Sequence, residues 1–454
     1  MFKIAIAGTG YVGLVTGVCL AEVGYQVICV DIDENKINLL RAGRSPIYEP
    51  DVEKLMQKNY AAGKLDYTTD YKSAYKTVDA IFIGVGTPEK PDGSADLSYI
   101  AKVARQIAET VEKDCLVVVK STVPVGTAEK IEQFIQDFLL HDVRIELASN
   151  PEFLSQGSAV QNTLNAERII IGTESKWAEE MLREIYKPFQ LPIVSVKRRS
   201  AEMIKYAANS FLALKISYIN DIANLCECVG ADIQDVAIGM SYDTRIGNRF
   251  LNAGIGFGGS CFPKDTKALE YFSRQHGYEL RTIQAAIEVN KDQKRMLYQK
   301  ARKRLITFSG LKVAVLGLTY KPGTDDIRES ASVENIQLLL EEGAEIYAFD
   351  PTGAAKIGTI YPEGKIGKGC IKYVHDVEEA VKGADICFIF TEWDEIVSII
   401  PSTFKRLMRT PLVYDGRNIY NVKEMEKAAV EYYSIGRTSG KPQITSQIQK
   451  QFSY

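Results

Sequence analysis

The stretch that decides the fold is KIAIAGTGYVG, residues 3–13. Its first part, Lys3–Ala7, is predicted to form a buried β-strand, and the second part fits the pattern G-x-G-x-x-G. In such a loop the first glycine permits a tight turn, the second lets the backbone approach a pyrophosphate, and the third lets the helix pack on the strand. The amides at the start of the following predicted helix can bind phosphate. The stretch therefore predicts a dinucleotide-binding α/β unit.

An acidic residue stands where such a unit binds the ribose. The next expected strand, Gln26–Val30, ends at Asp31. A carboxylate there accepts hydrogen bonds from both ribose hydroxyls and repels a 2′-phosphate, which favours NAD over NADP, although Lys36 is a base nearby. FAD-binding proteins use the same loop and a structural glycine turn is a further alternative, but NAD is the preferred interpretation.

The rest of the first 150 residues continues the same alternation. Residues 80–85, 116–120 and 144–148 read as buried strands, and residues 101–111 and 127–139 read as amphipathic helices. Strands that alternate with helices predict a parallel sheet covered on both faces, which is a doubly wound fold.

Two further loops and a carboxylate are expected at the carboxyl edge of that sheet, where open α/β sheets bind ligands. Residues 84–88 follow one strand and residues 120–127 follow another, and both loops contain Ser or Thr beside Gly and Pro. Glu152 follows the next strand. Ordinary loops have a similar composition, but their place beside the glycine loop favours a binding role.

A long helix is predicted over residues 200–229, which contain no proline. At about 30 residues it would be about 45 Å long, so it can join two domains or form a dimer interface, or it can be buried in one domain. A second α/β unit begins at Leu311. Its expected elements are the strands Lys312–Leu316, Glu345–Phe349, 386–390 and Leu412–Asp415 and the helix 332–342.

Composition argues against several classes of protein. The chain has 454 residues, with 55 Lys and Arg against 58 Asp and Glu, so it is not expected to bind nucleic acid. Three His residues argue against a His-rich metal site, and no metal is predicted. No apolar run of about 18 residues predicts a membrane span, and no signal peptide precedes the first strand. We expect a cytoplasmic protein with reduced thiols.

The segment that most strongly indicates chemistry is GIGFGGSCFPKD, residues 254–265. Its glycines are expected to expose backbone amides and to let a ligand approach closely. Cys261 follows them, and a cation and a carboxylate come next. Because positive charge and amides stabilise a thiolate, Cys261 is a candidate nucleophile, the alternative being a small buried residue. Cys19, Cys29 and Cys387 lie in apolar patterns and are predicted to be core residues. The others are interpreted as packing residues: Cys226 and Cys228 end the long helix, and Cys115 and Cys370 begin or border strands.

A nucleophilic cysteine beside an NAD site suggests a four-electron oxidation. Removal of a hydride from an alcohol gives an aldehyde, a thiolate adds to it, a second hydride transfer gives a thioester, and water releases an acid. Lys205 and Asn209 are four residues apart on the predicted long helix and so share a face. Together they could stabilise an oxyanion, although a solvated surface position is the commoner fate of a lysine.

With these residues in view, the chain resembles the UDP-glucose 6-dehydrogenase family over nearly its whole length. The motifs that carry the resemblance are residues 8–13, 120–127, 150–154, 205–209, 243–247, 256–265 and 318–330. The resemblance implies oxidation of UDP-glucose to UDP-glucuronate with two NAD. The catalytic residues that it implies are the nucleophile Cys261, the oxyanion-stabilising Lys205 and Asn209, the water-positioning or proton-transferring Thr122 and Asp265, and the acid–base group Glu152.

The motifs and the resemblance together assign two sets of binding residues. Those expected to contact NAD are Gly8, Gly10, Tyr11, Val12, Gly13, Asp31, Lys36, Gly86, Thr87, Ser121, Thr122, Glu152, Lys264 and Arg328. Those expected to contact the nucleotide sugar are Glu152, Phe153, Leu154, Lys205, Asn209, Arg245, Phe250, Leu251, Asn252, Gly254, Phe257, Gly258, Cys261, Phe262, Tyr320, Lys321 and Arg417. Arg245 would reach the site of a partner subunit, although a surface ion pair is the alternative for it and for Arg328.

The family resemblance also completes the expected fold. It implies an α/β protein with two Rossmann-like doubly wound domains joined by a long central helix and a helical dimerisation region. The expected domains are an NAD-binding domain (1–197), a central helical domain (198–299) and a UDP-sugar-binding domain (300–454). A homodimer is expected and higher oligomers are possible, in a protein that serves UDP-glucuronate and polysaccharide biosynthesis.

One position departs from the family pattern. Many members carry an acid four residues after the glutamate that corresponds to Glu152, whereas this chain has Gln156. An amide can orient a water or a ribose but cannot act as a general base. Proton transfer would then fall to Glu152 or Asp265.

Three alternatives stay open at this point. The enzyme could act on another nucleotide sugar (UDP-ManNAc, UDP-GlcNAc, UDP-GalNAc or GDP-mannose), though residues 245–251 resemble the glucose-specific group. A two-electron hydroxyacid dehydrogenase also joins a Rossmann domain to a long helix, but it needs neither the cysteine nor a second nucleotide domain. A non-catalytic sensor would bind the ligands without turnover.

Overall fold

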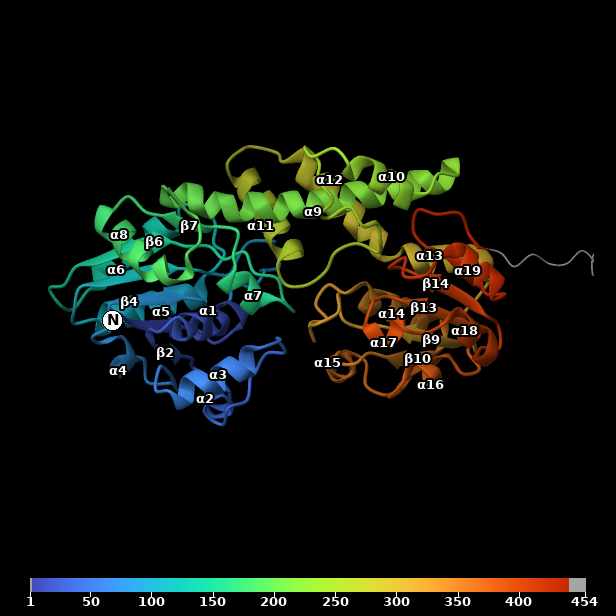
Figure 1. Ribbon diagram of the computed structural model, residues 1–454, viewed down its shortest axis with the longest axis horizontal. Helices are drawn as coiled ribbons and strands as arrows, with labels where there is room; N and C mark the ends of the chain where they lie inside the picture. Colours follow the sequence, from blue (N-terminus) through green and yellow to red (C-terminus); the bar gives the residue numbers. More distant parts are fainter. Residues whose placement is uncertain (1, 441–454) are drawn as a thin grey trace, which may run out of the picture. The chain divides into compact units, whose positions relative to one another are not determined.

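The computed structural model describes residues 2–440, which form two compact units (Figure 1). Of the described residues, the first unit comprises 2–209 and Lys264–Glu279, and the second comprises Ser210–Pro263 and 280–440. Two helices, α9 (Arg198–Val229) and α11 (Phe262–Gln275), contribute residues to both units. The division into three domains remains a prediction, and residues 441–454 of the last one lie outside the described residues.

The first unit is built on an eight-stranded sheet with the order β3-β2-β1-β4-β5-β6-β7-β8. Every neighbouring pair is parallel except β6 and β7, which are antiparallel. The parallel sheet that was predicted from the first 150 residues is confirmed for the strands named there, β1, β2, β4, β5 and β6. The antiparallel strand β7 lies beyond those residues. The strands are β1 (Lys3–Ala7), β2 (Gln26–Val30), β3 (Leu65–Thr68), β4 (Ala80–Ile83), β5 (Cys115–Val119), β6 (Ile145–Ser149), β7 (Ile169–Gly172) and β8 (Ile193–Val196).

Both faces of this sheet are covered because alternate residues of each central strand enter different hydrophobic cores. Ile4 and Ile6 of β1 belong to one core, and Ala5 and Ala7 belong to the other. A strand that is buried on both faces reads as a continuous apolar run, which is why its sequence was recognisable. The covering helices are α1 (Tyr11–Glu22), α2 (Glu34–Arg41), α3 (Val52–Ala61), α4 (Tyr71–Tyr75), α5 (Ser98–Thr110), α6 (Thr127–Phe138), α7 (Ala159–Leu164), α8 (Lys176–Tyr186) and the 3-10 helix Lys187–Phe189.

The second unit repeats the plan with a seven-stranded sheet of order β11-β12-β10-β9-β13-β14-β15, in which only β11 and β12 pair antiparallel. Val313 and Val315 of β9 face one core, and Ala314 and Leu316 face the other. The strands are β9 (Lys312–Leu316), β10 (Glu345–Phe349), β11 (Gly364–Ile366), β12 (Gly369–Tyr373), β13 (Ile386–Ile389), β14 (Leu412–Asp415) and β15 (Glu431–Tyr433). The helices wholly within this unit are α10 (Ile233–Ser241), α12 (Arg281–Lys294), α13 (Met296–Arg304), α14 (Ala331–Glu342), α15 (Ala354–Ile360), α16 (Val377–Val381), α17 (Asp394–Val397), α18 (Pro401–Leu407) and α19 (Val422–Lys427).

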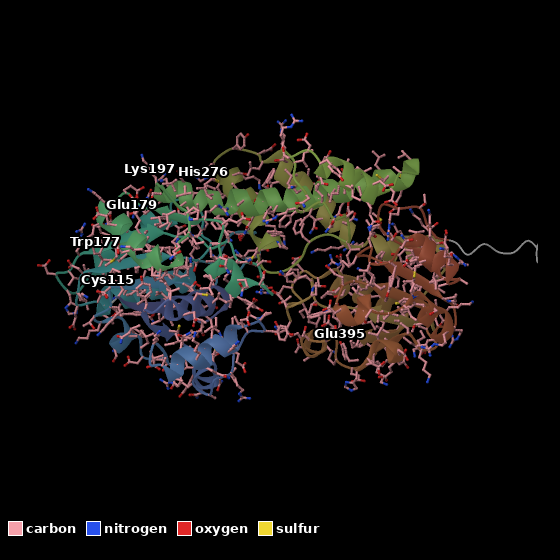
Figure 2. The ribbon with its side chains drawn as sticks, viewed as in Figure 1. Cys115, Trp177, Glu179, Lys197, His276 and Glu395 are labelled. Atoms are coloured by element: carbon pink, nitrogen blue, oxygen red, sulfur yellow. The ribbon has the colours of Figure 1, made fainter. Side chains whose placement is uncertain are left out.

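Cys19, Cys29 and Cys387, which were predicted to be core residues, are buried. Cys115, labelled in Figure 2, is the first residue of β5 and is buried as well. Cys228, near the end of α9, is exposed. Cys261 is partly exposed. Within residues 2–440, no helix combines the length and the apolar character that crossing a membrane requires.

Candidate active site

The glycine loop between β1 and α1 has the geometry that a pyrophosphate needs. Gly8 has a φ of +98°, and a Cβ atom on Gly13 would lie 2.0 Å from the carbonyl oxygen of Gly8. A Cβ atom on Gly10 would instead have no described atom within 4 Å, and Gly10 caps α1 without a side-chain hydrogen bond. Two of the three glycines are thus required by the fold, whereas Gly10 faces open space at a helix N-terminus, as phosphate binding requires.

Asp31, directly after β2, is held by the same loop. Its carboxylate accepts hydrogen bonds from the backbone amide (2.9 Å) and the hydroxyl (2.6 Å) of Thr9, and Lys36 lies 3.9 Å away. Burial acts to raise the pKa of Asp31, but the hydrogen bonds from Thr9 and Asp33 and the charge of Lys36 outweigh it and lower that pKa. The residue therefore presents a charged carboxylate at the carboxyl edge of the sheet.

The two predicted edge loops are joined to each other and to the glycine loop. The hydroxyl of Thr87 donates to the carbonyl of Thr122 (2.9 Å), and the hydroxyl of Ser121 donates to the carbonyl of Val85 (2.6 Å). A Cβ atom on Gly84 would lie 2.8 Å from the Cα atom of Gly13, so these loops pack directly on the start of α1. Sequence positions that are far apart are thus assembled on one edge, and Gly86 beside them faces open space.

Lys205 and Glu152 form a buried ion pair in the first unit. The Lys205 ammonium donates to the Glu152 carboxylate (3.1 Å) and to its backbone carbonyl (2.5 Å), and the two side chains are 4% and 8% exposed. The Glu152 carboxylate also accepts the amide of Leu154 at 2.7 Å. The ring of Phe153 lies 5.2 Å from the Lys205 ammonium. The alternative that Lys205 is a solvated surface lysine is therefore wrong.

Asn209, one turn after Lys205 on α9, contacts a second carboxylate. Its side-chain amide donates to Asp265 at 2.6 Å, and Lys264 forms an ion pair with the same carboxylate. Asp265 is almost completely buried and lies in the first turn of α11. The first unit therefore brings together Lys205, Glu152, Asn209 and Asp265, which sequence reasoning had placed in three separate segments.

A second buried lysine, which sequence reasoning did not single out, supports this region. The Lys120 ammonium donates to the side-chain oxygen of Asn150 at 3.0 Å, and the Tyr186 hydroxyl donates to the same oxygen. Burial is the main cause that lowers the pKa of Lys120 to about 8. Lys120 therefore anchors the start of the segment that carries Glu152. Gln156 is also buried.

The glycine-rich segment before Cys261 is shaped by packing within the second unit. A Cβ atom on Gly258 would lie 2.5 Å from the carbonyl oxygen of Glu329, and one on Gly259 would lie 2.7 Å from the ring of Tyr320. The same atom on Gly254 or Gly256 would also meet protein atoms within 3 Å. Close packing therefore requires glycine at these positions. The prediction that they expose amides for a ligand is wrong for Gly254 and Gly259, whose amides donate to the side chain of Asn220 and to the carbonyl of Arg328.

Cys261 directly precedes α11, in the second unit. Unpaired amides and the dipole at a helix N-terminus stabilise an anion, so the position suits a thiolate. The Cys261 sulfur lies 3.7 Å from the Ser260 hydroxyl. The ring of Phe262, the next residue, lies 6.0 Å from that of Phe257 and 6.3 Å from that of Phe250.

Arg417, after β14, is tied to the segment after β9. Its guanidinium donates to the carbonyl of Tyr320 (2.7 Å) and to the carbonyl of Phe390 (2.7 Å), and the Lys321 ammonium lies 5.6 Å from the Tyr320 ring centre. Gly254 packs close to the carbonyl of Gly416. The second unit thus gathers Gly254, Tyr320, Lys321 and Arg417 from three predicted segments.

The remaining predicted residues lie in varied environments. Leu251 belongs to the hydrophobic core, Asn252 is exposed, and Phe250 has a φ of +65°. The Arg245 side chain is 85% exposed and forms an ion pair with Asp243 at 2.6 Å. The Arg328 guanidinium forms an ion pair with Asp326 at 2.6 Å. Among the residues that the structure describes, no three His, Cys, Asp or Glu side chains are grouped to hold a metal ion.

Comparison with known proteins gives a consistent result along the chain. Models of the UDP-glucose/GDP-mannose dehydrogenase family match over residues 2–190 (NAD binding domain), 199–292 (central domain) and 314–422 (UDP binding domain). The chain is 48% identical over 440 residues to UDP-glucose 6-dehydrogenase YwqF of Bacillus subtilis, covering 97% of this chain and 99% of that protein. It is 44% identical to the UDP-glucose 6-dehydrogenase of Rhizobium meliloti, covering 96% and 99%.

Two solved structures are similar in fold. The UDP-glucose dehydrogenase of the archaeon Pyrobaculum islandicum has a TM-score of 0.89 and 37% identity, covering 96% of this chain and 98% of that one. The UDP-D-ManNAc dehydrogenase of Pyrococcus horikoshii has a TM-score of 0.84 and 28% identity, covering 96% and 99%.

Proposed function

The chain belongs to the UDP-glucose/GDP-mannose dehydrogenase family, and we propose that it oxidises UDP-glucose to UDP-glucuronate with two NAD through a covalent intermediate on Cys261. The observation that carries the proposal is the 48% identity to a UDP-glucose 6-dehydrogenase over 97% of the chain. The related UDP-D-ManNAc dehydrogenase is only 28% identical, so a substrate other than UDP-glucose is not favoured.

In the proposed reaction the C6 alcohol of the sugar loses a hydride and a proton, which gives an aldehyde. The Cys261 thiolate then adds to the aldehyde carbon, and the resulting thiohemiacetal loses a second hydride to become a thioester. Water attacks the thioester, the carbon–sulfur bond breaks, and the thiolate is restored. The sum is one alcohol, two NAD⁺ and one water converted to one carboxylate, two NADH and three protons. When bound, NAD supplies the hydride acceptor.

The buried polar groups of the first unit take the remaining roles. Lys205, an ammonium with three donors, and Asn209, an amide, would stabilise the oxyanion that forms when the thiolate or the water adds. Glu152, which already holds the Lys205 ammonium, would take the proton of the alcohol. Asp265 would orient the attacking water together with the hydroxyl of Thr122.

Binding of NAD would use the edge assembled in the first unit. The amides after Gly10 would bind the pyrophosphate, since this residue faces open space at the start of α1. The charged Asp31 carboxylate would accept the ribose hydroxyls. Thr87 and Ser121 hold the neighbouring loops in place for the nicotinamide half. The remaining predicted NAD contacts are Gly8, Tyr11, Val12, Gly13, Lys36, Gly86, Lys264 and Arg328.

The second unit would bind the nucleotide sugar through the groups gathered between β9 and β14. Lys321 and Arg417 would neutralise phosphate charge. Local cations of this kind can bind an anionic ligand even though the chain as a whole has a small negative net charge. We also propose the division into an NAD-binding domain (1–197), a helical domain (198–299) and a UDP-sugar-binding domain (300–454). The family matches over residues 2–190, 199–292 and 314–422 support it.

We also propose that two copies of the chain pair through α9. Phe211, Tyr218 and Leu225 are exposed and follow each other at seven-residue intervals, so they form one apolar stripe that Val229 extends. A self-complementary helix face is what a twofold dimer requires. A soluble dimer in the cytoplasm would supply UDP-glucuronate for polysaccharide synthesis, and Arg245, exposed in a single copy, would reach the partner's site.

Counting NADH tests the function directly. Purified protein with NAD and a limiting amount of UDP-glucose should release two NADH per sugar, while UDP-ManNAc, UDP-GlcNAc, UDP-GalNAc and GDP-mannose should release little. Cys261→Ser should stop formation of the acid, and Cys228→Ser, at an exposed thiol on α9, should not. One NADH per sugar, or full acid production by Cys261→Ser, would refute the covalent four-electron reaction.

A further inference from the structure

Glu202 is a buried carboxylate that the proposed chemistry does not use. It lies on α9, three residues before Lys205, and only 3% of it is exposed. Its two oxygens accept hydrogen bonds from the amides of Gly126 (2.6 Å) and Ala128 (2.9 Å). A carboxylate that accepts two backbone amides in the interior is held in one position.

Those amides belong to the N-terminus of α6, a helix of 12 residues. Gly126 is the N-cap, with a φ of +87°, and it has no side chain to satisfy the free amides. Glu202 supplies that cap from another element, and the positive end of the helix dipole favours its negative charge. Burial is the main cause that raises the pKa of Glu202, and the bonds from Ala128 and Gly126 oppose it.

The chain that Glu202 secures is the loop that carries Thr122. Residues 120–126 connect β5 to α6, and the hydroxyl of Ser121 fixes the beginning of the loop to the carbonyl of Val85. Glu202 fixes the end of the loop at Gly126. Thr122 thus lies between two anchors, and one of them stands on the helix that carries Lys205.

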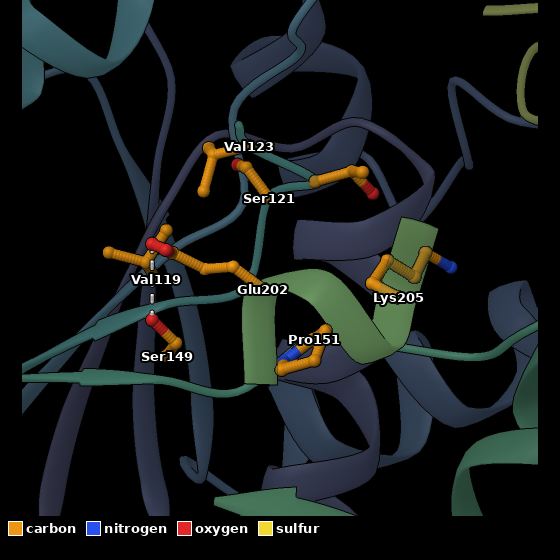
Figure 3. Close-up of a pocket in the computed structure, with 8 residues that line it drawn as sticks. Val119, Ser121, Val123, Ser149, Pro151, Glu202 and Lys205 are labelled. Atoms are coloured by element: carbon orange, nitrogen blue, oxygen red, sulfur yellow. Dashed lines mark hydrogen bonds between the residues drawn. The ribbon is translucent and has the colours of Figure 1, made fainter. Parts of the chain in front are cut away.

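A small cavity shows that these parts converge. Its volume is about 10 Å³, and it is lined by Val119, Ser121, Thr122, Val123, Ser149, Pro151, Glu202 and Lys205 (Figure 3). Figure 3 shows Glu202 and Lys205 on the same helix, with the hydroxyl of Ser149 bonded to Glu202 at 3.5 Å. The cavity is close to the smallest size that admits one water molecule.

We propose that Glu202 is a positioning residue for the dehydrogenase reaction, whose carboxylate holds the Thr122 loop in register with Lys205 through the N-terminus of α6. The proposal rests on the proposed function, because it assumes that Thr122 and Lys205 both act on the substrate. Loss of the hydrogen bonds from Gly126 and Ala128 to Glu202 should therefore slow the chemical step more than it weakens the binding of NAD or of UDP-glucose.

The chain offers a matched control at the surface. Glu129, also in the first turn of α6, pairs with Arg199 of α9 at 2.6 Å, so it joins the same two helices. Both of these side chains are substantially exposed, and exposed ion pairs contribute little. Glu129→Gln therefore removes a charge from the same pair of helices without touching the buried cap. The charged or titratable groups around Glu202 are Glu129 on α6 and Arg199, Lys205 and Tyr206 on α9.

The test compares Glu202→Gln, Glu202→Asp and Glu129→Gln in the full-length protein. A Gln side chain turns one acceptor into a donor that faces an amide, and an Asp side chain is too short to reach both amides. We expect kcat with UDP-glucose to fall about tenfold in Glu202→Gln, with KM for NAD and for UDP-glucose within twofold of wild type. The kcat of Glu202→Asp should lie between those of wild type and Glu202→Gln, and the kcat of Glu129→Gln should equal that of wild type.

Hydrogen exchange gives a readout that does not depend on turnover. The amides of Gly126 and Ala128 should exchange faster in Glu202→Gln and Glu202→Asp, and should exchange at the wild-type rate in Glu129→Gln. Where Glu202→Gln does not accumulate as folded protein, Glu202→Asp decides alone. Wild-type kcat in the folded Glu202 variants, or a raised KM with unchanged kcat, would overturn the positioning role. Wild-type protein that makes no NADH from UDP-glucose would instead refute the proposed function.

Discussion

The ammonium of Lys205 lies 3.1 Å from a carboxylate oxygen of Glu152, and both side chains are buried in the first unit. Two opposite charges withdrawn from water hold each other in place, because either one alone would pay a large desolvation cost. The pair thereby fixes an ammonium one helical turn from Asn209. An oxyanion site needs donors that are in position before charge develops, and this arrangement provides them.

Glu152→Gln should weaken both stability and turnover. The change leaves the Lys205 ammonium buried without an opposing charge, and breaking such a pair costs about 3 kcal/mol or more. Loss of a general base lowers turnover by about 100-fold or more. Urea unfolding and steady-state kinetics measure the two effects. Glu146→Gln is the control, because Glu146 on β6 pairs with Arg144, whose side chain is exposed. Normal stability together with normal turnover in Glu152→Gln would show that the pair of Lys205 and Glu152 is dispensable.

Gly10→Ala and Gly13→Ala should separate ligand binding from folding. Alanine at Gly13 would place a Cβ atom 2.0 Å from the Gly8 carbonyl oxygen, so unfolding free energy should fall by about 2 kcal/mol or more. Alanine at Gly10 meets no described atom within 4 Å, so unfolding free energy should change by less than about 1 kcal/mol. KM for NAD should nevertheless rise about tenfold in Gly10→Ala, since the methyl group would occupy the path of the pyrophosphate. Thermal unfolding and NAD titration check both, and unchanged NAD binding by Gly10→Ala would contradict this placement.

Asp31→Asn should raise KM for NAD about tenfold and narrow the preference for NAD over NADP, because a neutral amide no longer repels a 2′-phosphate. The pKa of Asp31 is lowered, so its carboxylate stays charged throughout the neutral range. KM for NAD in the wild type should therefore stay constant between about pH 6 and 9 as far as this group is concerned. Kinetics with both cofactors at several pH values measure this. If wild type and Asp31→Asn preferred NAD over NADP to the same degree, the charge of Asp31 would have no role in cofactor selection.

Lys120 should make stability depend on pH in the alkaline range. Its pKa falls from 10.5 in the unfolded chain to about 8 in the fold, so between these values the unfolded chain binds the additional proton. The contribution of Lys120 to the free energy of unfolding should therefore rise by about 3 kcal/mol in total as pH increases from about 8 to 10.5. The difference in unfolding free energy between wild type and Lys120→Met, measured by urea at several pH values, isolates the effect. A difference that does not change with pH would contradict it.

Leu225→Asp should separate the proposed dimer. The residue lies on the exposed apolar stripe of α9, where a carboxylate in a closed helix interface would be desolvated without a partner. Light scattering after size exclusion should show a twofold decrease in mass. Ile306→Asp, at another exposed apolar residue of the second unit, should leave the mass unchanged. A wild-type protein that is already monomeric, or a dimer that survives the change, would refute pairing through this stripe.

Much of the fold could be predicted because its central strands are buried on both faces. Strands β1, β2, β9 and β10 begin and end at the residues that the sequence predicted for them. Strands β3, β8, β11 and β15, at the sheet edges, were missed, and so were β7 and β12, each next to an edge strand. An edge strand has only one neighbour and less burial, so its sequence carries a weaker apolar signal; β8, for example, has two exposed residues among its four.

The candidate site was predictable where the chain itself brings residues together. The helical spacing of Lys205 and Asn209 predicted that they share one face, and Asp31 could be singled out by its place after a strand. Glu202 and Lys120 could not be singled out, because their partners Gly126 and Asn150 are distant in sequence. Nothing local to either residue reveals a buried charge.

The sequence by itself determined the two α/β units, the dinucleotide loop, the acid that we expect to bind the ribose and the cysteine that the family resemblance marks as the nucleophile. These are local properties, set by hydrophobic period, glycine spacing and side-chain chemistry within a few residues. Only the tertiary structure decided which charges are buried and with what partners. Burial and pairing depend on segments that are far apart in sequence, and they alone decide whether Lys205 is a surface cation or a group held against Glu152.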